Sequence, residues 1–575
     1  MIGSPYFSPI FEGMLTITGL SIGKKGSTEK LVDNIGFHLE SGQTLGVVGE
    51  TGSGKSLTAL SIMGLLPQQL EIQKGIILLD DKDITRLSAK EQESIRGQRI
   101  SMIFQEPMTA LNPVMRCGKQ VLEVIRQHRK ITTKDAKKEV LELFQKVRLP
   151  RPEKIFSAYP HEISGGQKQR IMIAMAMANK PDLLIADEPT TALDVTVQKE
   201  ILKLLKALQL EYGMTLLFIT HDLAVVAEIA EQVAVMHKGK IVESGPAKEI
   251  FLNPKHPYTK GLLSCRPPQN VRLNQLPTLQ DFLNTKEEFV PDPVSSDART
   301  KRLKTLYEKD PLFRVDALEK DYVLSKSFWG KPREILQAVN GVSFNVYPGE
   351  TLGLVGESGC GKTTLGRSLL RLIDPDKGSI LYQTEDLATL SRKAMKPLRK
   401  DLSIVFQDPY SSLNPRISIG EAIMEPMRVH KLYKSKKECR EQAMELLQKT
   451  GLEEAHFYRY PHEFSGGQRQ RIVIARALAL QPKFIICDEA VSALDVSVQA
   501  VVLNLLNKLK SEFGFTYIFI SHDLSVVRFM SDRIMVMKDG NIVEVGDADE
   551  VYHHPKEEYT RQLIAAVPNI HYSTI

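Results

Sequence analysis

The chain has 575 residues, of which 42% are hydrophobic and 25% are charged. These values are ordinary for globular proteins and exclude a mainly disordered chain, and the length predicts more than one domain. The net charge of +6 is small for this size, so it gives little support to a nucleic-acid-binding function. No apolar run reaches the ~18 residues of a membrane-spanning helix, and the first residues lack the pattern of a secretory signal.

The five cysteines are scattered along the chain and include no C-x-x-C pair. Neither a disulfide framework nor a zinc site is therefore expected. Unpaired cysteines are typical of a reducing compartment, which favours the cytoplasm.

A long internal repeat sets the domain organisation. TLGVVGETGSGKS at residues 44–56 returns as TLGLVGESGCGKT at 351–363, and YPHEISGGQKQRI at 159–171 returns as YPHEFSGGQRQRI at 460–472. FITHDLAVV and FISHDLSVV form a further pair, as do NPKHPYTKGLL and HPKEEYTRQLI. Equivalent residues are offset by 301 to 307 positions, so the chain contains two copies of one domain.

The joint between the copies is predicted at residues 266–311, where prolines mix with charged residues and no clear apolar periodicity is visible. We therefore expect a first domain at residues 1–265, a linker at 266–311 and a second domain at 312–575.

Within each copy, short apolar runs alternate with helical stretches, which predicts an α/β fold with a largely parallel sheet. TLGVV and DLLIA are typical of strands, and QKEILKLLKALQLEYG is typical of a helix. Residues 134–149 have apolar side chains at helical spacing and predict a second, helical subdomain.

Each copy carries a P-loop, G-x-x-x-x-G-K-[ST], directly after an apolar run. In such a loop the glycines allow backbone N–H groups to close around phosphate oxygens, and the following helix N-terminus favours the anion. Lys55 and Lys362 are predicted to reach the β- and γ-phosphates of ATP. Ser56 and Thr363 are predicted to bind Mg²⁺.

Two further apolar runs, LLIADE and FIICDE, end in paired carboxylates. Asp187 and Asp488 are predicted to lie near the Mg²⁺ or its waters. The following residues, Glu188 and Glu489, are predicted to polarise the attacking water.

Taken together, these motifs resemble the nucleotide-binding domains of ABC (ATP-binding cassette) proteins. SGGQ after Pro-His-Glu resembles the family's signature loop, and TALD and SALD resemble its D-loops. Gln105 and Gln407 resemble the Q-loop glutamines. His221 and His522 resemble the switch histidines, since each follows its glutamate by 33 residues. The resemblance implies two tandem P-loop NTPase domains, each a RecA-like α/β core with a helical subdomain.

The resemblance also implies that the copies pair head to tail, with each ATP held between one P-loop and the opposite signature loop. Both copies retain the implied catalytic groups, so we expect both to hydrolyse ATP. The predicted catalytic residues are Glu188, Glu489, His221 and His522. The predicted ATP-binding residues are Gly49, Glu50, Thr51, Gly52, Ser53, Gly54, Lys55, Ser56, Leu57, Gly356, Glu357, Ser358, Gly359, Cys360, Gly361, Lys362, Thr363, Thr364, Ser164, Gly165, Gly166, Gln167, Ser465, Gly466, Gly467 and Gln468. The predicted Mg²⁺ ligands are Ser56, Gln105, Asp187, Thr363, Gln407 and Asp488.

The subgroup most resembled is the oligopeptide/dipeptide class of importer ATPases, on the basis of QEPMTALNP, QDPYSSLNP and the HPYTKGLL-type tail. This implies an energy-coupling subunit for import of peptides or peptide-like solutes, peripheral to the cytoplasmic face of the inner membrane. Its partners would be two transmembrane permeases and an extracytoplasmic solute-binding protein, with no nucleic acid. Only Cys265 lies in the first tail, so no iron–sulfur cluster of the kind some relatives carry is expected.

Two other ABC classes are alternatives. A soluble tandem protein acting on ribosomes is the main alternative, but the linker is proline-bearing and shows no helical charge pattern. A chromosome-maintenance ATPase is disfavoured because no long heptad segment separates the motifs.

Two departures distinguish the copies. ABC domains stack adenine on an upstream aromatic residue; Tyr322, Phe328 or Trp329 could serve in the second copy, whereas LTITGLSIGKKGSTEKLV in the first contains none. Weaker ATP binding is therefore expected at Lys55. Cys360 lies inside the second P-loop, where a helix N-terminus and Lys362 predict a lowered thiol pKa and inactivation by alkylation.

Overall fold

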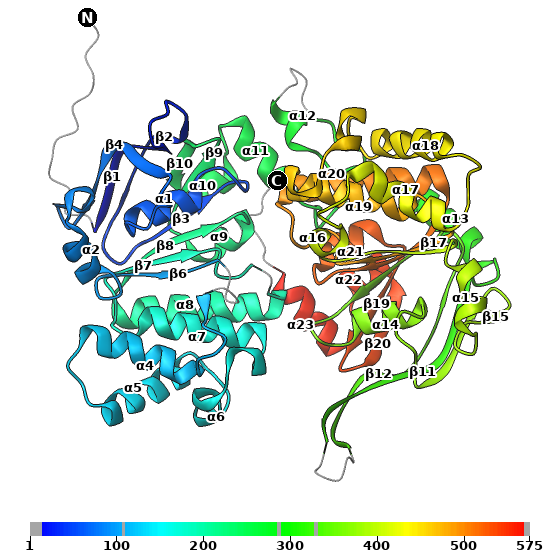
Figure 1. Cartoon of the computed structure of the whole chain (residues 1–575), viewed down its shortest axis with the longest axis horizontal. Helices are drawn as coiled ribbons and strands as arrows, with labels where there is room; N and C mark the ends of the chain where they lie inside the picture. Colours follow the sequence, from blue (N-terminus) through cyan, green and yellow to red (C-terminus); the bar gives the residue numbers. More distant parts are fainter. Residues whose placement is uncertain (1–13, 106–109, 192, 284–288, 327–331, 568–575) are drawn as a thin grey trace, which may run out of the picture. The chain divides into compact units, whose positions relative to one another are not determined.

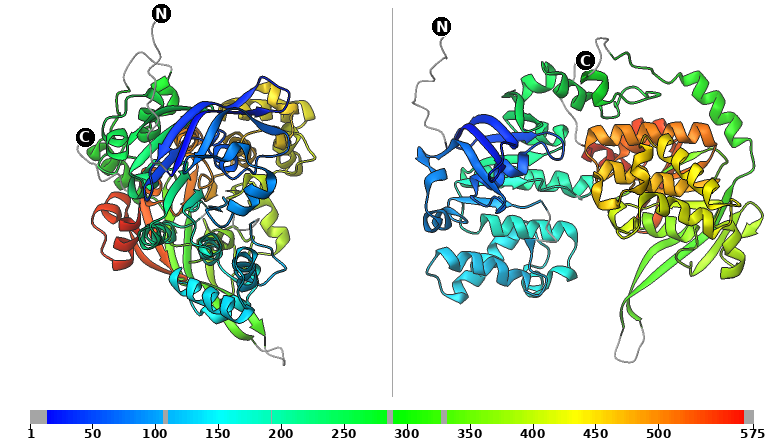
Figure 2. Two further views of the ribbon diagram at one scale, coloured as in Figure 1. Left: turned by 90° about the vertical axis from the view of Figure 1, so that its left-hand side faces the viewer. Right: turned by 45° about the horizontal axis from the view of Figure 1, so that its top comes forward.

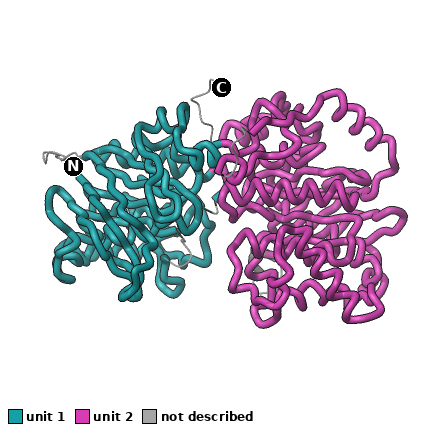
Figure 3. Tube along the Cα trace, turned by 90° about the horizontal axis from the view of Figure 1, so that it is seen from above, with its two compact units in different colours: residues 1–193, 197–263, 568–575 teal, residues 194–196, 264–567 magenta. Residues whose placement is uncertain are grey.

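The computed structural model describes residues 14–105, 110–191, 193–283, 289–326 and 332–567. Within these residues, the chain divides into two compact units (Figure 3). Unit 1 comprises residues up to 193 together with 197–263, and unit 2 comprises 194–196 together with 264–567. Unit 1 thus holds most of the first copy, and unit 2 holds the second copy together with the predicted linker.

Each unit is built on a six-stranded sheet of the same topology. The order is β10-β9-β3-β8-β7-β6 in unit 1 and β20-β19-β13-β18-β17-β16 in unit 2, with only the first pair antiparallel. The strands of unit 1 are β3 (Thr44–Val48), β6 (Ile100–Ile103), β7 (Leu183–Asp187), β8 (Thr215–Thr220), β9 (Gln232–His237) and β10 (Lys240–Pro246). Those of unit 2 are β13 (Thr351–Val355), β16 (Leu402–Val405), β17 (Phe484–Asp488), β18 (Thr516–Ile520), β19 (Arg533–Lys538) and β20 (Asn541–Asp547).

The central strands are buried along their whole length, which explains why they are continuous apolar runs rather than alternating ones. The predicted α/β fold is confirmed. Because these strands are parallel, the loops that follow them emerge at one edge of the sheet, where ligands bind in folds of this class.

A second, antiparallel sheet in each unit was not predicted. It has the order β2-β1-β4-β5 in unit 1 and β12-β11-β14-β15 in unit 2. Its strands are β1 (Leu15–Lys24), β2 (Lys30–Leu39), β4 (Leu70–Leu79), β5 (Lys82–Asp83), β11 (Phe313–Lys326), β12 (Pro332–Val346), β14 (Lys377–Tyr382) and β15 (Glu385–Asp386). In unit 1 it shares a core with α1 (Lys55–Ile62) and with β7, so α1 packs between the two sheets (Figure 1).

Helices form the remaining layers, and α4, α5 and α6 of unit 1 gather away from the antiparallel sheet (Figures 1 and 2). The other helices of unit 1 are α2 (Ala89–Ile95), α4 (Cys117–His128), α5 (Thr133–Lys146), α6 (Pro152–Ser157), α7 (Gly165–Met177), α8 (Val195–Tyr212), α9 (Leu223–Ile229), α10 (Ala247–Leu252) and α11 (Pro257–Ser264). Those of unit 2 are α12 (Leu279–Leu283), α13 (Ser296–Tyr307), α14 (Lys362–Leu369), α15 (Arg392–Leu398), α16 (Pro409–Ser412), α17 (Ile419–Val429), α18 (Lys436–Lys449), α19 (Gly466–Leu478), α20 (Val496–Phe513), α21 (Leu524–Met530), α22 (Ala548–His553) and α23 (Glu558–Ala566).

The helix predicted at residues 134–149 is α5. It begins at Thr133, where the Thr132 side chain accepts a hydrogen bond from the Asp135 N–H. It ends three residues before the predicted position, because Arg148 adopts a φ of 57° that cannot continue a right-handed helix. The predicted helical subdomain is therefore present.

The predicted linker is part of unit 2 and contains α12 and α13. Helix α13, on which Leu303 and Leu306 are buried, was not predicted. Leu276 is also fully buried in the core of unit 2, and its backbone N–H and C=O are both paired with the side chain of Asn504, at 2.9 and 2.8 Å. The segment thus packs onto the second copy rather than lying free of it.

Among the described residues, no helix combines the length and the apolar character needed to cross a membrane. All five cysteines are buried.

Candidate active site

The two P-loops follow β3 and β13, the central strands of their sheets. Gly49 and Gly356 begin them with φ angles of 155° and 153°. A Cβ at Gly49 would lie 2.1 Å from the Met236 carbonyl oxygen, and one at Gly356 would lie 2.2 Å from that of Met537. Only glycine therefore permits this close turn. Helices α1 and α14 begin directly at the P-loop lysines, so the helix N-termini face the loops.

The P-loop lysines are buried, each with 4% of its surface exposed. Lys55 Nζ donates to the carbonyl oxygens of Gly49 and Glu50 at 2.7 and 2.9 Å. Lys362 Nζ donates to those of Gly356 and Glu357, both at 2.8 Å. A buried ammonium beside a helix N-terminus is an arrangement suited to binding a phosphate anion.

Each lysine is followed by a hydroxyl residue that contacts a buried aspartate. Ser56 Oγ lies 3.2 Å from Asp187 Oδ1, and Thr363 Oγ1 lies 2.9 Å from Asp488 Oδ1. Burial, together with the neighbouring Glu188, raises the pKa of Asp187 to about 6 against the lowering effect of Ser56 and Lys55. Burial likewise raises the pKa of Asp488. A buried carboxylate of this kind is stabilised in its charged form by a nearby cation.

The hydroxyl and carboxylate pair fits Mg²⁺, which takes oxygen ligands and retains several from water and substrate phosphates. No cluster of three or more His, Cys, Asp or Glu side chains suited to a metal is found in the part of the chain that the structure describes.

In the first site, three side chains contact the carboxylate of Glu188. Its Oε2 accepts a hydrogen bond from Gln105 Nε2 at 3.0 Å and from Thr191 Oγ1 at 2.9 Å, and it lies 3.2 Å from His221 Nδ1. Burial raises the pKa of Glu188, but His221 and Thr191 outweigh it and lower that pKa to about 2. The side chain is thus held as a carboxylate, able to accept a hydrogen bond from a water.

The backbone at this position is strained in both copies. Glu188 and Glu489 have φ angles of 47° and 49°, in the left-handed region that non-glycine residues rarely occupy. Their N–H groups donate to the carbonyls of Ile219 and Ile520, at 2.8 and 3.0 Å, which ties each glutamate to the neighbouring strand. Strain of this kind is commonly found where a side chain must be aimed for function.

The second site differs in its contacts to the glutamate. Gln407 Nε2 donates to Glu489 Oε2 at 2.8 Å, while His522 Nδ1 is 3.6 Å from the same oxygen. Ser492 Oγ, at the position of Thr191, donates to the Glu489 backbone carbonyl at 3.0 Å instead of to the carboxylate. Burial again raises the pKa of Glu489, but His522 and Lys362 lower it overall.

Gln105 and Gln407 were predicted as Mg²⁺ ligands, and the structure places the amide nitrogen of each on the predicted catalytic glutamate of its copy. Their role as metal ligands stays a prediction. The glutamate contact of Thr191 was not predicted, although Thr191 lies within the TALD motif.

The signature loops form the N-termini of α7 and α19. Ser164 Oγ accepts from the Gln167 N–H at 3.3 Å, and the Ser164 N–H donates to Gln167 Oε1 at 3.2 Å. Ser465 and Gln468 make the same reciprocal pair, at 3.4 and 3.1 Å. This capping arrangement fixes the start of a 13-residue helix whose N–H groups can bind an anion.

The predicted lowering of the Cys360 thiol pKa is wrong. Its side chain is 7% exposed, with Sγ 3.8 Å from Lys362 Nζ. Burial raises the pKa of the thiol and outweighs the opposing effect of Lys362. Cys360 is therefore held as a neutral thiol, and the predicted sensitivity to alkylation loses its basis.

Of the three candidate adenine-stacking residues, the structure describes only Tyr322. Tyr322 lies on β11 with 36% of its surface exposed, and its ring centroid is 5.8 Å from Lys320 Nζ. Phe328 and Trp329 lie outside the described residues. The identity of an adenine-stacking residue stays a prediction.

A family model described as ABC transporter matches residues 32–191 and 339–492, together more than half of the chain. The chain belongs to the ABC transporter family. A second model, described as the C-terminal region of oligopeptide/dipeptide transporters, matches residues 242–289 and 543–574 of this ABC protein, one match at the end of each copy.

Two relatives with 46% sequence identity agree with this assignment. The ABC protein is 46% identical over 564 residues to the glutathione import ATP-binding protein GsiA of Salmonella choleraesuis (strain SC-B67), covering 96% of this chain and 89% of the relative. It is 46% identical over 563 residues to GsiA of Escherichia coli (strain K12), with the same coverage. A solved dimeric ATP-binding cassette, bound to ADP and phosphate after hydrolysis, is 31% identical and covers 41% of this chain and 98% of that one, with a TM-score of 0.38.

The prediction of two tandem ABC ATPase domains is confirmed. This ABC protein is an ATPase and the energy-coupling subunit of an importer. The relatives are importer subunits, so they favour import over the ribosome-acting alternative.

Proposed function

We propose that this ABC protein energises the import of short peptides or peptide-like solutes of the glutathione type. The observation that carries the proposal is the match of both tails, residues 242–289 and 543–574, to the C-terminal region of oligopeptide/dipeptide transporters. The GsiA relatives, whose name states glutathione import, support the solute class.

In each copy, the P-loop lysine and the helix N-terminus bind the phosphates of ATP. Glu188 and Glu489 orient the attacking water by accepting its hydrogen bond, since both are held as carboxylates. His221 and His522 position these carboxylates. A glutamate whose pKa is about 2 is a weak base, so Glu188 orients the water rather than storing its proton.

Mg²⁺ would be held by Ser56 and Asp187 in the first copy and by Thr363 and Asp488 in the second. When bound, it would neutralise charge that develops on the phosphate oxygens. The signature loops, residues 164–167 and 465–468, are proposed to bind the γ-phosphate. Head-to-tail pairing of the copies stays an implication of the family resemblance.

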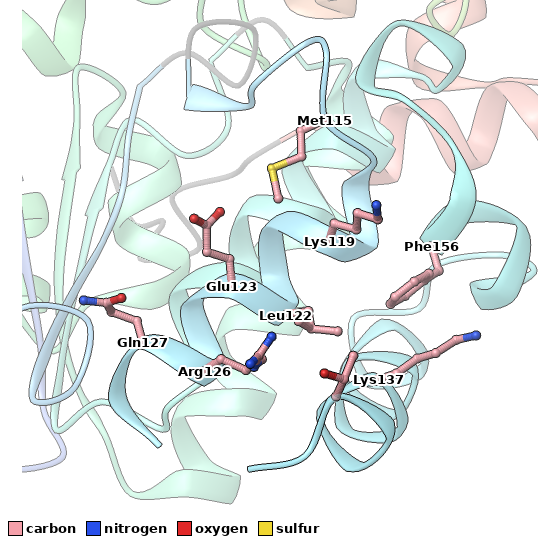
Figure 4. A pocket seen from close by; sticks show the side chains of 9 residues that line it. Met115, Lys119, Leu122, Glu123, Arg126, Gln127, Lys137 and Phe156 are labelled. Atoms are coloured by element: carbon pink, nitrogen blue, oxygen red, sulfur yellow. The ribbon is translucent and has the colours of Figure 1, made fainter. Parts of the chain in front are cut away.

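Two hollows of the first copy offer surfaces for a permease. One, of about 560 Å³, lies over α4, α5 and α6 and is lined by Met115, Leu122 and Phe156, with charged side chains at its rim (Figure 4). The other, of about 220 Å³, is lined by Phe104, next to Gln105, and by Met172 and Met175 of α7. Methionine-rich apolar surfaces adapt well to a docked helix.

The proposed partners are two transmembrane permeases and an extracytoplasmic solute-binding protein, with the ABC protein peripheral to the cytoplasmic face of the inner membrane. A permease helix that docks beside Gln105 would be linked to Glu188 through one hydrogen bond. Closure of the copies on ATP would thereby move the permeases.

Uptake of labelled glutathione and of labelled tripeptides tests the solute class. Cells whose own copy is replaced by the Glu188→Gln and Glu489→Gln double variant should lose this uptake while retaining uptake of an unrelated sugar. Unchanged peptide and glutathione uptake would contradict the proposal. Cofractionation of the protein with ribosomes instead of membranes would support the alternative.

A further inference from the structure

The repeated tails place a tyrosine in the same position of each copy. Tail helices α11 and α23 follow β10 and β20 after the short helices α10 and α22, and each carries a tyrosine near its start, Tyr258 and Tyr559. In the first copy, Glu243 of β10 accepts hydrogen bonds from the backbone N–H groups of Lys255 and His256, at 2.7 and 3.1 Å. Its carboxylate thus anchors the chain leading into α11.

The second copy repeats this anchor. Glu544 of β20 accepts from the N–H groups of Lys556 and Glu557, at 2.9 and 3.2 Å. An equivalent carboxylate thus holds each tail to the strand beside it, so the tyrosines are presented in the same way.

Each tyrosine hydroxyl binds the P-loop of its own copy. The Glu50 N–H donates to Tyr258 Oη at 3.1 Å, and the Glu357 N–H donates to Tyr559 Oη at 3.1 Å. In the first copy the hydroxyl also lies 3.4 Å from Glu50 Oε2. The contacts span 208 and 202 residues of sequence, so the tail and the P-loop meet only through the fold.

The same peptide group also carries the lysine contact. The N–H of Glu50 and the C=O of Gly49 belong to one planar peptide unit. Its N–H is held by Tyr258, and its C=O accepts the Lys55 ammonium at 2.7 Å. The unit between Gly356 and Glu357 is held likewise by Tyr559 and Lys362. Because the unit is planar, fixing its N–H fixes the direction of the carbonyl that receives the lysine.

The rings are held from the strand next to the P-loop strand. The Tyr258 ring is fully buried and stacks on His237, with 4.0 Å between ring centroids. At the equivalent position, Lys538 Nζ lies 4.9 Å from the centroid of the Tyr559 ring. Both neighbours are the last residues of their strands, β9 and β19, so each hydroxyl is fixed before a nucleotide arrives.

We propose that Tyr258 and Tyr559 are positioning residues of the two ATP sites, which fix the peptide plane that orients the P-loop lysine. They touch neither phosphate nor water in this scheme and act through Lys55 and Lys362. The inference rests on the assignment of these lysines to phosphate binding and is independent of the imported solute.

Replacing both tyrosines by phenylalanine tests the proposal, since Tyr258→Phe and Tyr559→Phe remove only the hydroxyls and retain the rings. Loss of one hydrogen bond per site should raise the KM of the full-length protein for MgATP about 3- to 10-fold. Because the lysine binds phosphate in both ground state and transition state, kcat should stay within about 2-fold. Binding of ATP in EDTA should weaken by a similar factor.

Tyr382→Phe is the matched control, because it removes a buried hydroxyl that contacts Asp401 at 3.3 Å, away from the P-loop. A KM within 2-fold of wild type in the double variant, or an equal rise in the control, would overturn the proposal. A fall in kcat at unchanged KM would also overturn it. If the double variant folds poorly, the two single variants carry the same test.

The double variant Lys55→Ala and Lys362→Ala distinguishes phosphate binding by the lysines from positioning by the tyrosines. Retention of ATP affinity in this pair would refute the phosphate-binding assignment on which the tyrosine role rests. Loss of affinity in the lysine pair with normal affinity in the tyrosine pair would refute the positioning role alone.

Discussion

The two copies share a fold but differ in the chemistry beside the P-loop strand. In the first, the Thr44 N–H donates to Glu231 at 2.8 Å, and the Thr44 hydroxyl donates to Gln209 at 3.2 Å. In the second, the Thr351 N–H donates to Asp532 at 2.9 Å, and Lys510 replaces the glutamine as the partner of the threonine hydroxyl. An amide in one copy has become a buried ammonium in the other.

In the second copy, Asp532 and other acidic residues bind arginines of the connecting segment, residues 266–311. Arg302 of α13 binds Asp532 through two hydrogen bonds, at 2.6 and 3.1 Å, and Arg299 lies 2.7 Å from Asp547 and 3.3 Å from Asp549. Arg272 also binds Asp549, at 3.1 Å.

The first copy has different residues at the equivalent positions. Pro246 stands where Asp547 does, Lys248 where Asp549 does, and Lys203 where Asn504 does. A duplicated domain can therefore retain its predicted catalytic residues while only one copy has a surface that binds the connecting segment.

Substitution of the predicted catalytic glutamates, Glu188 and Glu489, should lower ATP hydrolysis in both copies. Changing Glu188 and Glu489 together to Gln should lower the ATPase rate by roughly 10²–10⁴-fold while leaving ATP binding intact. Each single variant should also lose ATPase activity, but less than the double variant. Steady-state ATPase assays and ATP titrations check it. A normal rate in the double variant would refute the assignment, and an effect confined to one single variant would show that only one copy hydrolyses ATP.

Asp532 is where the copies should differ in stability. Asp532→Asn removes the carboxylate that pairs with Lys510 and with Arg302, whose side chain is 49% exposed, so it should destabilise unit 2 by about 1.5–3 kcal/mol. The matched change in the first copy, Glu231→Gln, should cost only about 1 kcal/mol, since Gln can still accept from Thr44. Hydrogen exchange of β13 and α13, compared with that of β3, measures both. Equal losses of protection in the two variants would refute the comparison.

Acid should reveal the contribution of Asp532 to the stability of unit 2. Burial raises the pKa of Asp532, but Lys510 and Arg302 outweigh it and lower that pKa from 3.8 to about 2. A depressed folded-state pKa contributes stability above the unfolded value, so about 2 kcal/mol is fully present above pH 4 and is lost as the pH falls towards 2. Unfolding of unit 2 should therefore depend more steeply on pH in this window in wild type than in Asp532→Asn. Identical slopes would contradict the prediction.

The smallest expected difference between the two copies is in their affinity for ATP. Loss of one stacking contact is worth on the order of 1 kcal/mol, or several-fold in affinity. Lys362→Ala, which leaves the first site, should therefore bind ATP more weakly than Lys55→Ala, which leaves the second. Titration with a fluorescent ATP analogue measures this difference. Equal affinities would remove the proposed asymmetry.

The candidate site residues could be predicted from the sequence where they lie in short motifs. The P-loops, the DE pairs and the histidines could be located because each follows a strand and the whole set occurs twice. The strands β1 and β11 were missed because their ladders contain register shifts, for example between Ile17 and Leu20, which break the alternating pattern. Helix α13 was missed because its exposed face is highly charged and only Leu303 and Leu306 are buried.

The error over Cys360 has a different origin. Its neighbours along the chain favour a thiolate, but burial is a property of the whole fold and proved the larger effect. The tyrosine contacts were out of reach for a similar reason, because the tail motif gives no sign of which loop it meets.

The contact between Tyr258 and Glu50 also bears on the order in which each copy folds. It joins residues 208 positions apart, so the entropy of closing that loop must be overcome before the contact forms. Long-range contacts of this kind slow folding, and the tail can dock only after β9 and β10 are in place. Nucleotide affinity should therefore be acquired later than secondary structure during refolding. A copy interrupted before its tail would have a formed sheet and a P-loop whose lysine is not yet aimed, so recovery of ATP binding would report completion of the fold.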